Sequence, residues 1–140
     1  MKIAVVYWSG TGNTAAMAQS VADGARGAGA EVDLLQAAGF DADKMDAYDA
    51  VAFGCPSMGA EQLEESVFEP MFEGCRAKLS GKKIGLFGSW GWGGGEWMNN
   101  WRSTCLGDGA VLAADPVICN DAPDDAASAA CQDLGAALAK

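Results

Sequence analysis

Residues 9–14 read SGTGNT and directly follow an apolar run. Small residues let the backbone wrap closely around a ligand, and the N–H groups at the start of a following helix favour an anion. Side-chain donors and glycines alternate in this loop, at Ser9, Gly10, Thr11, Gly12, Asn13 and Thr14. The pattern predicts an anion-binding loop, and the alternative is an ordinary glycine turn that caps a helix.

This loop contains no lysine or arginine. A GxxxxGK loop followed by Ser or Thr would bring a cation to the β and γ phosphates of a nucleotide together with a magnesium ligand, so a nucleotide triphosphate is disfavoured. Hydrogen bonds to a charged group are worth about 1.5–3 kcal/mol each, so uncharged donors can hold an anion. We therefore expect one terminal monophosphate at residues 9–14.

A second loop, residues 55–65, reads CPSMGAEQLEE. Met58 is polarisable and flexible, and it precedes Gly59, whose peptide can adopt conformations closed to other residues. Glu61 follows within reach of the edge of a ligand. Taken alone this loop is weak support for a site, because a methionine before a glycine more often packs in the core and residues 61–65 suit the solvated start of a helix.

A third loop, residues 88–97, reads GSWGWGGGEW. Trp90 and Trp92 alternate with glycines just after an apolar run, in a segment too rich in glycine to form core. Exposed indoles cost solubility unless they meet something flat. The loop predicts a stacking platform for an aromatic ligand, and the alternative is that both indoles pack against neighbouring loops.

The composition excludes several classes of function. With no histidine, mechanisms that use imidazole as base, acid or metal ligand are removed. The five cysteines form no CxxC or zinc pattern and none begins C-x5-R, so we expect reduced thiols, no metal site and no cysteine phosphatase. The net charge of −10 repels nucleic acid and anionic lipid, and it favours basic partners or serves solubility.

The chain length limits the number of domains, and the absence of a long apolar stretch argues against a membrane-spanning segment. A length of 140 residues suits one domain, expected to span residues 1–140. No stretch of about 18 residues is free of charge, polar residues or glycine, so neither a membrane span nor a secretory leader is expected. We expect a cytoplasmic protein.

Strand and helix patterns alternate along the chain. The helical patterns comprise Met17, Val21, Ala25 and Ala28, ended by Gly27 and Gly29; Leu63, Val67 and Met71, kinked or ended by Pro70; Met98, Trp101 and Cys105; and Ala127, Cys131, Leu134 and Leu138. Apolar strands are expected at residues 2–8, 31–35, 50–54, 83–88 and 111–119, the last interrupted at Pro116, with a polar segment at 41–46.

This alternation indicates an α/β fold with a parallel sheet and helices on both faces, a three-layer α/β/α sandwich. Such sheets bind ligands outside the carboxyl ends of their strands, where the strand order reverses. The loops after the first, third and fourth strands are the three loops described above, so we expect them to meet at one site.

Taken together, these motifs resemble those of flavodoxin, in its short-chain form from anaerobic bacteria. The resemblance covers nearly the whole chain, through YWSGTGNT, GCPSMG, FGSWGWGGGEWM and NDAPDD. It implies a flavodoxin-like, five-stranded parallel sheet of order 2-1-3-4-5 and non-covalently bound flavin mononucleotide (FMN). The cofactor-binding residues that it implies are Ser9, Gly10, Thr11, Gly12, Asn13, Thr14, Pro56, Ser57, Met58, Gly59, Glu61, Ser89, Trp90, Gly91 and Trp92.

The resemblance also assigns roles to several of these residues. Met58 and Trp92 would sandwich the isoalloxazine ring, Glu61 would accept a hydrogen bond from N3–H, and the Gly59 carbonyl would accept one from N5–H of the semiquinone. Two positions depart from the usual family pattern. Trp90 stands where a tyrosine is usual and lacks the phenol hydroxyl, and Ala60 stands where an acidic or polar residue is common.

The function implied is that of a low-potential one-electron carrier, shuttling between semiquinone and hydroquinone, and not that of an enzyme. Its acidic surface would steer it, as a monomer, to redox proteins with basic docking faces such as oxidoreductases and ferredoxin-linked reductases. The alternative is a small FMN-dependent reductase of quinones or nitro compounds, although 140 residues leave little room for a substrate pocket. A phospho-acceptor receiver is disfavoured, because Trp8-Ser9 and Gly54-Cys55 stand where it needs acidic residues.

Overall fold

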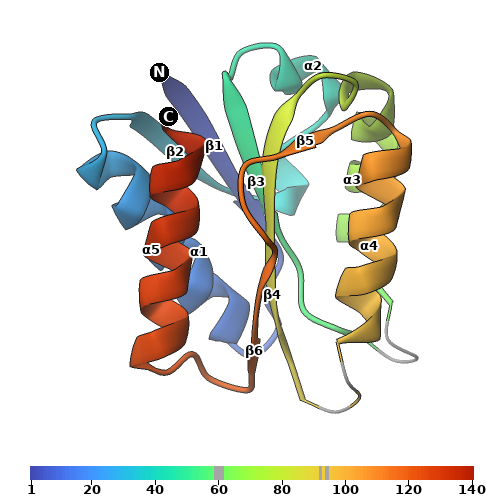
Figure 1. Cartoon of the computed structure of the whole chain (residues 1–140). Helices are drawn as coiled ribbons and strands as arrows, with labels where there is room; N and C mark the ends of the chain where they lie inside the picture. Colours follow the sequence, from blue (N-terminus) through green and yellow to red (C-terminus); the bar gives the residue numbers. More distant parts are fainter. Residues whose placement is uncertain (59–61, 92, 94) are drawn as a thin grey trace.

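The computed structural model describes residues 1–58, 62–91, 93 and 95–140. Within this part of the chain, strands and helices alternate as the sequence predicts (Figure 1). The strands are β1 (Lys2–Tyr7), β2 (Glu31–Gln36), β3 (Ala50–Gly54), β4 (Lys83–Trp90), β5 (Val111–Leu112) and β6 (Val117–Asn120).

The helices fill the connections between these strands. They are α1 (Asn13–Gly27), α2 (Ala42–Met45), α3 (Phe68–Cys75), α4 (Glu96–Gly107) and α5 (Asp125–Leu138), with short 3-10 turns η1 (Ala37–Gly39) and η2 (Arg76–Lys78). No described helix is long and apolar enough to cross a bilayer.

The strands form one sheet in the order β2-β1-β3-β4-β5, and every pairing is parallel. The predicted order is therefore confirmed. The fifth strand is split into two pieces that both pair with β4, Lys83 lying opposite Val111 and Phe87 opposite Val117. Pro116, which has no N–H to donate, lies in the break, as its position in the sequence predicts.

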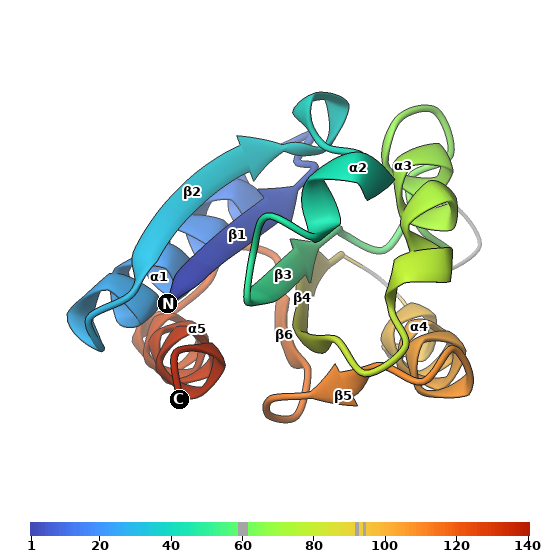
Figure 2. The same ribbon diagram turned by 90° about the horizontal axis from the view of Figure 1, so that it is seen from above.

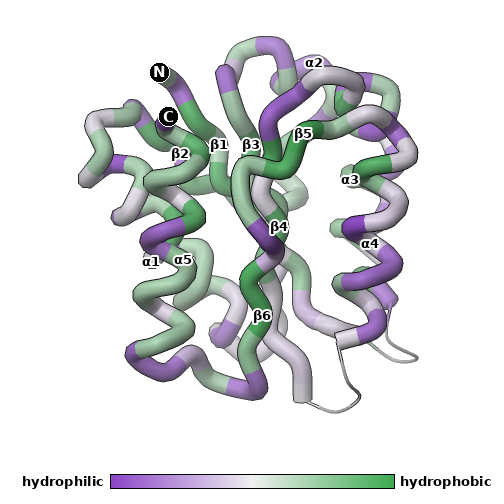
Figure 3. The backbone as a smooth tube through the Cα atoms, in the orientation of Figure 1, coloured by the Kyte–Doolittle hydropathy of each residue, from purple (hydrophilic) through white to green (hydrophobic). Residues whose placement is uncertain are grey.

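Helices cover both faces of the sheet, with α1 and α5 on one side and α3 and α4 on the other (Figure 2). Alternation along β1 divides its buried side chains between these faces, Ile3 and Val5 facing α1 and α5 and Ala4 and Val6 facing the opposite layer. The strands are accordingly mostly apolar, whereas α4 and α5 carry hydrophilic and hydrophobic residues in turn (Figure 3). The three-layer prediction is confirmed.

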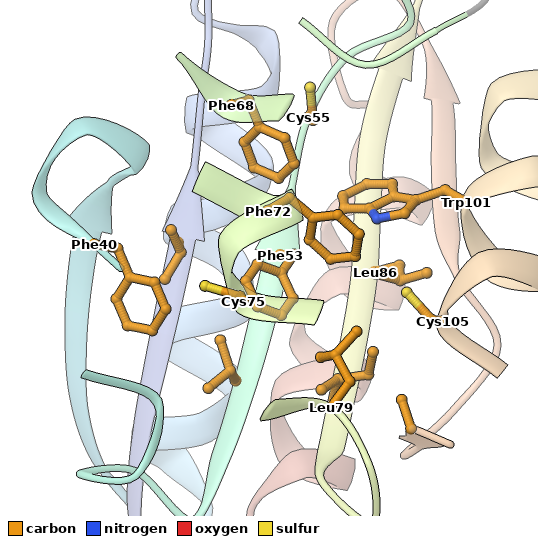
Figure 4. Packing of buried hydrophobic residues seen from close by; sticks show 14 of the residues in the cluster. Phe40, Phe53, Cys55, Phe68, Phe72, Cys75, Leu79, Leu86, Trp101 and Cys105 are labelled. Atoms are coloured by element: carbon orange, nitrogen blue, oxygen red, sulfur yellow. The ribbon is translucent and has the colours of Figure 1, made fainter. Parts of the chain in front are cut away.

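The layer beneath α3 and α4 is rich in aromatic side chains (Figure 4). Phe53 of β3 meets Phe72 of α3 edge to face, with ring centroids 5.3 Å apart, and Trp101 of α4 meets Phe72 at 5.6 Å. These rings join the sheet to both helices and hold α3 and α4 against it.

Two expectations for the segments outside the sheet are wrong. Pro70 neither kinks nor ends α3 but lies in its first turn, where the missing N–H would have no helical partner. Consequently the buried face of α3 is formed by Phe68, Phe72 and Cys75. Leu63 and Val67, expected on one helical face with Met71, lie before α3, which begins at Phe68. The polar segment 41–46 contains α2, with Asp41 as its N-cap.

Candidate functional site

The loops that follow β1, β3, β4 and β6 meet at the carboxyl end of the sheet around a cavity of about 230 Å³. Predicted site residues supply most of its lining, so the expectation that three separate loops converge is confirmed. The lining residues are Trp8, Gly10, Thr11, Asn13, Pro56, Ser57, Met58, Ser89, Trp90, Gly91 and Asp121.

The first loop ends at an uncapped helix. Gly12 is the residue before α1 and has a φ of 97°, a left-handed conformation that favours glycine. It offers no side chain to the first-turn N–H groups of α1, and no capping hydrogen bond from a side chain to them is found within the described part of the chain. The start of α1 therefore presents free N–H donors and a positive dipole end, which suit an anion.

Thr14 lies in this first turn and is buried, with 1% of its surface exposed. Its Oγ1 atom has no hydrogen-bond partner, one of two such buried side-chain atoms within the described residues. A buried hydroxyl without a partner costs free energy, so one that persists calls for an explanation. An acceptor held at the start of α1 would complete its hydrogen bonding.

Ser9 and Gly12 border a neighbouring cavity of about 290 Å³ rather than the first one. The Gly12 N–H donates to Ser9 Oγ at 3.0 Å, which closes the loop on itself. Trp8 borders both cavities, and its ring lies 3.0 Å from where a Cβ on Gly10 would stand. Sequence reasoning missed Trp8, although a large aromatic residue directly before a glycine loop is the signal that could have found it.

The second loop is tied to the sheet at Ser57 and closed on itself at Met58. Ser57 N–H donates to the Ser89 carbonyl at 3.0 Å, which joins the loops after β3 and β4. Met58 and Gln62 form an antiparallel bridge with hydrogen bonds of 2.9 and 3.0 Å. Met58 thereby stands at the cavity wall, whereas Gly59 and Glu61, to which we assigned cofactor contacts, lie outside the described residues.

The third loop leaves β4 next to the second. A Cβ on Gly88 would lie 2.1 Å from the Cys55 carbonyl oxygen, so only glycine allows the two strand ends to approach this closely. Trp90 is the last residue of β4, half-buried, and it lines the cavity while packing against the aromatic layer. It is therefore part of the sheet as well as of the cavity wall. Trp92 lies outside the described residues.

Asp121 contributes a fourth loop that sequence reasoning did not assign to the site. Its φ is 56°, the one left-handed conformation found among the described non-glycine residues, and Asp and Asn tolerate it best. The hydroxyl of Ser89 donates to the Asp121 carbonyl at 2.6 Å, and Asp121 N–H donates to the Trp90 carbonyl at 2.8 Å. Its position two residues before a proline, at the end of the last strand, is the available signal.

Among the described residues that line the cavity, Asp121 alone is charged. Cys55 lies beneath it, fully buried, and burial raises the pKa of its thiol to about 12, so it is no nucleophile at neutral pH. Within the described part of the chain no cluster of Cys, Asp or Glu side chains could hold a metal ion. The arrangement can bind a flat ligand with an anionic tail.

The chain is similar to proteins of one family over nearly its whole length. The family model for flavodoxin matches residues 5–133. The flavodoxin of Megasphaera elsdenii is 44% identical over 138 residues, which cover 99% of this chain and 98% of that protein. The flavodoxin of Clostridium beijerinckii is 43% identical over 122 residues, 87% of this chain and 88% of that protein.

Solved structures agree with the sequence comparison. The solution structure of two-electron reduced Megasphaera elsdenii flavodoxin matches with a TM-score of 0.90 and covers 98% of both chains. A flavodoxin from the domain Archaea matches with a TM-score of 0.86 at 28% identity, over 99% of this chain and 96% of that one. These relatives favour the carrier over a small flavin reductase. The chain belongs to the flavodoxin family and is an FMN-binding electron carrier, not an enzyme.

Proposed function

We propose that the cavity at the carboxyl end of the sheet holds FMN, with the phosphate at the start of α1 and the flavin ring beside Met58. The cofactor-binding residues proposed are the fifteen expected from the sequence, together with Trp8 and Asp121. Twelve of the fifteen lie in the described loops at or next to the cavity. Gly59, Glu61 and Trp92 complete the proposed set with the contacts named in the sequence analysis.

The unpartnered Thr14 hydroxyl is the observation that carries this proposal. It lies in the uncapped first turn of α1, where free N–H groups and the helix dipole both favour an anion. Such a place fits a phosphate group and needs no cation. The side chains of Thr11 and Asn13, which line the adjoining cavity, supply further donors at the same end.

FMN supplies reversible transfer of single electrons through its ring. The protein binds the phosphate with neutral donors and presents Met58 and Trp90 as apolar, polarisable walls that exclude water. Its carboxylates near the cavity, among them Asp121, oppose the gain of negative charge inside it. This arrangement supports a carrier that works at low potential.

The proposed partners are redox proteins with basic docking faces. None of the ion pairs found within the described residues includes Glu65, Asp121 or Asp125. These acidic residues therefore leave the end of the molecule that holds the flavin negatively charged. We further propose that the chain acts as a single-domain monomer in the cytoplasm.

Thr14→Val tests the phosphate site, because it removes the hydroxyl and keeps the shape of the side chain. Apoprotein is titrated with FMN and with riboflavin, which lacks the phosphate, and flavin fluorescence quenching gives each Kd. We expect FMN to bind about tenfold more weakly or worse, since a hydrogen bond to a charged group is lost. Riboflavin binding should stay within about twofold on the same argument.

Thr104→Val is the matched control, because Thr104 lies on α4 outside this cavity. It should change neither Kd. A loss of FMN and riboflavin binding in equal proportion in Thr14→Val would contradict a phosphate at this position, and a wild-type apoprotein that binds no FMN would refute the proposal as a whole.

A further inference from the structure

Glu64 is the one glutamate among the buried polar residues of the described chain, with 5% of its surface exposed. Its Oε1 atom accepts hydrogen bonds from the Val67 N–H at 2.7 Å and the Phe68 N–H at 2.9 Å. Its Oε2 atom accepts from the Ser66 N–H at 2.8 Å and also from the Ser66 hydroxyl. One carboxylate thus satisfies three consecutive backbone donors at the start of α3.

No cation balances this carboxylate: none of the ion pairs found within the described residues includes Glu64. Burial by itself raises the pKa of the Glu64 carboxyl, but the hydrogen bonds from Ser66, Phe68 and Val67 outweigh it and lower the pKa to about 2. The group is therefore charged at neutral pH and is held by dipoles alone.

The main chain at Glu64 is also tied to the strand that carries the second loop. Glu64 N–H donates to Cys55 Sγ at 3.4 Å, and Cys55 directly follows β3. The Cys55 carbonyl in turn accepts from Trp97 Nε1 at 3.2 Å, which links the same point to α4. Cys55 and Glu64, on either side of the second loop, are thus held together.

The described residues between Cys55 and Glu64, Pro56–Met58 and Gln62–Leu63, are called the Met58 arm here. Within this arm, Met58 and Gln62 are joined by two backbone hydrogen bonds. Among the described residues, the arm is further held by the bond from Ser57 N–H to the Ser89 carbonyl, by a hydrogen bond from Gln62 Nε2 to Glu65 Oε1, and by Leu63, which packs against the core. Leu63 leads directly into Glu64, whose carboxylate binds the N–H groups at the start of α3, so the position of Met58 at the cavity depends on this anchor as well.

We propose that Glu64 is a positioning residue, which holds the Met58 arm in the geometry that flavin binding and tuning require. This inference rests on the proposed place of FMN. Glu64 does not line the cavity. It acts through the start of α3 and through Cys55, and its effect on the flavin is transmitted by the arm.

Glu64→Gln is the test, because an amide removes the charge and presents a donor to N–H groups that need acceptors. Glu65→Gln is the matched control, since Glu65 is the exposed neighbour, its replacement removes the same charge, and the amide oxygen of glutamine can still accept the hydrogen bond that Gln62 Nε2 donates to Glu65. FMN affinity of the apoprotein and the two one-electron midpoint potentials of the loaded protein are measured for both variants and for the wild type.

We expect Glu64→Gln to weaken FMN binding by about tenfold or more, because several hydrogen bonds to one charged acceptor are affected. Glu65→Gln should stay within about twofold of the wild type. The gap between the two midpoint potentials should also change more in Glu64→Gln, by about 59 mV for each tenfold change in the relative affinity for two redox states. A residue that only stabilised the fold would leave the potentials of the loaded fraction unchanged.

Glu64→Asp covers the case in which Glu64→Gln does not fold, because aspartate keeps the charge and is a good cap but has a shorter reach. It should recover part of the affinity and of the potential gap. The inference is overturned if Glu64→Gln and Glu65→Gln match in affinity and in both potentials, or if Glu64→Asp folds and behaves as the wild type. A wild-type protein that binds no FMN would instead refute the proposed function.

Discussion

The two ends of the parallel sheet use their charged groups in different ways. At the amino end, cations meet carboxylates directly: Lys78 Nζ lies 2.9 Å from Asp46, and Arg76 Nε lies 2.7 Å from Asp108. At the carboxyl end, two carboxylates are paired with backbone N–H groups instead, Glu64 at the start of α3 and Asp124 at the start of α5.

This difference concentrates negative charge where the flavin is proposed to bind. The ion pairs neutralise the amino end, whereas a backbone N–H stabilises a carboxylate and leaves its charge in place. A capping carboxylate therefore serves two purposes, because it fixes a loop and adds to the local potential. The comparison shows that aspartate and glutamate have different effects at the two ends of the sheet. Paired with cations they neutralise charge, and paired with backbone N–H groups they keep their charge near the proposed flavin site.

Gly88→Ala should have the largest effect and would test the close approach at the carboxyl end. The new Cβ would meet the Cys55 carbonyl at 2.1 Å, and neither backbone can move freely within the sheet. We expect a loss of about 3 kcal/mol in the free energy of unfolding, measured by urea denaturation, together with weaker FMN binding. Gly107→Ala is the control, because nothing lies within 4 Å of that Cβ, and it should be neutral or stabilising by up to about 1 kcal/mol. Equal free energies of unfolding for the two variants would contradict the close approach of Gly88 to Cys55 at the carboxyl end.

Acid unfolding should show the contribution of the Glu64 cap. The pKa of this carboxyl is lowered from 4.5 to about 2, so its stabilising effect is fully present above about pH 4.5 and is lost as the pH falls toward 2. We expect roughly 2 kcal/mol of pH-dependent stability in that window to be absent from Glu64→Gln, allowing for partial solvent screening. The free energy of unfolding of the apoprotein is measured from pH 6 to about pH 2. Parallel curves for the two proteins would argue that the cap is not formed in solution.

Asp121→Asn should give the smallest effect, and it tests whether negative charge at the carboxyl end of the sheet controls the potential of the flavin. Asparagine tolerates the positive φ of this position, so the substitution removes a charge beside the cavity with little change in shape. We expect the second one-electron midpoint potential to rise by up to about 70 mV, before salt screening. Asp46→Asn, at the amino end, should leave the potential unchanged. If the two variants shift it equally, the charge of one end does not control the site.

Most of the fold follows from local patterns in the sequence. Residues 50–54 are apolar at every position and form β3 with the predicted bounds, and the helical spacing of Ala127, Cys131, Leu134 and Leu138 marks the buried face of α5. The glycines and small polar residues of residues 9–14 mark the end of β1 and the start of α1 in the same way. These features are local, because strand burial and helix termination depend on neighbouring residues.

Tertiary contacts decided what the sequence pattern could not. Pro70 indicates a kink when only spacing is considered, but the packing of Phe68 and Phe72 places it in the first turn of α3. Trp8 and Asp121 belong to the cavity because strands distant in the sequence bring them there. The positioning role proposed for Glu64 likewise depends on a tertiary contact, because its N–H donates to the Sγ of Cys55 on the other side of the second loop.

The sequence by itself determined the strand and helix order, the three glycine-rich loops and the excess of negative charge. Each of these is set by composition or by spacing along the chain. Only the tertiary structure decided which carboxylates face cations and which face backbone N–H groups, and left the Thr14 hydroxyl buried without a partner. Partners of that kind are chosen by the packing of segments far apart in the sequence, because hydrogen bonds form over a few ångströms of space whatever the separation along the chain.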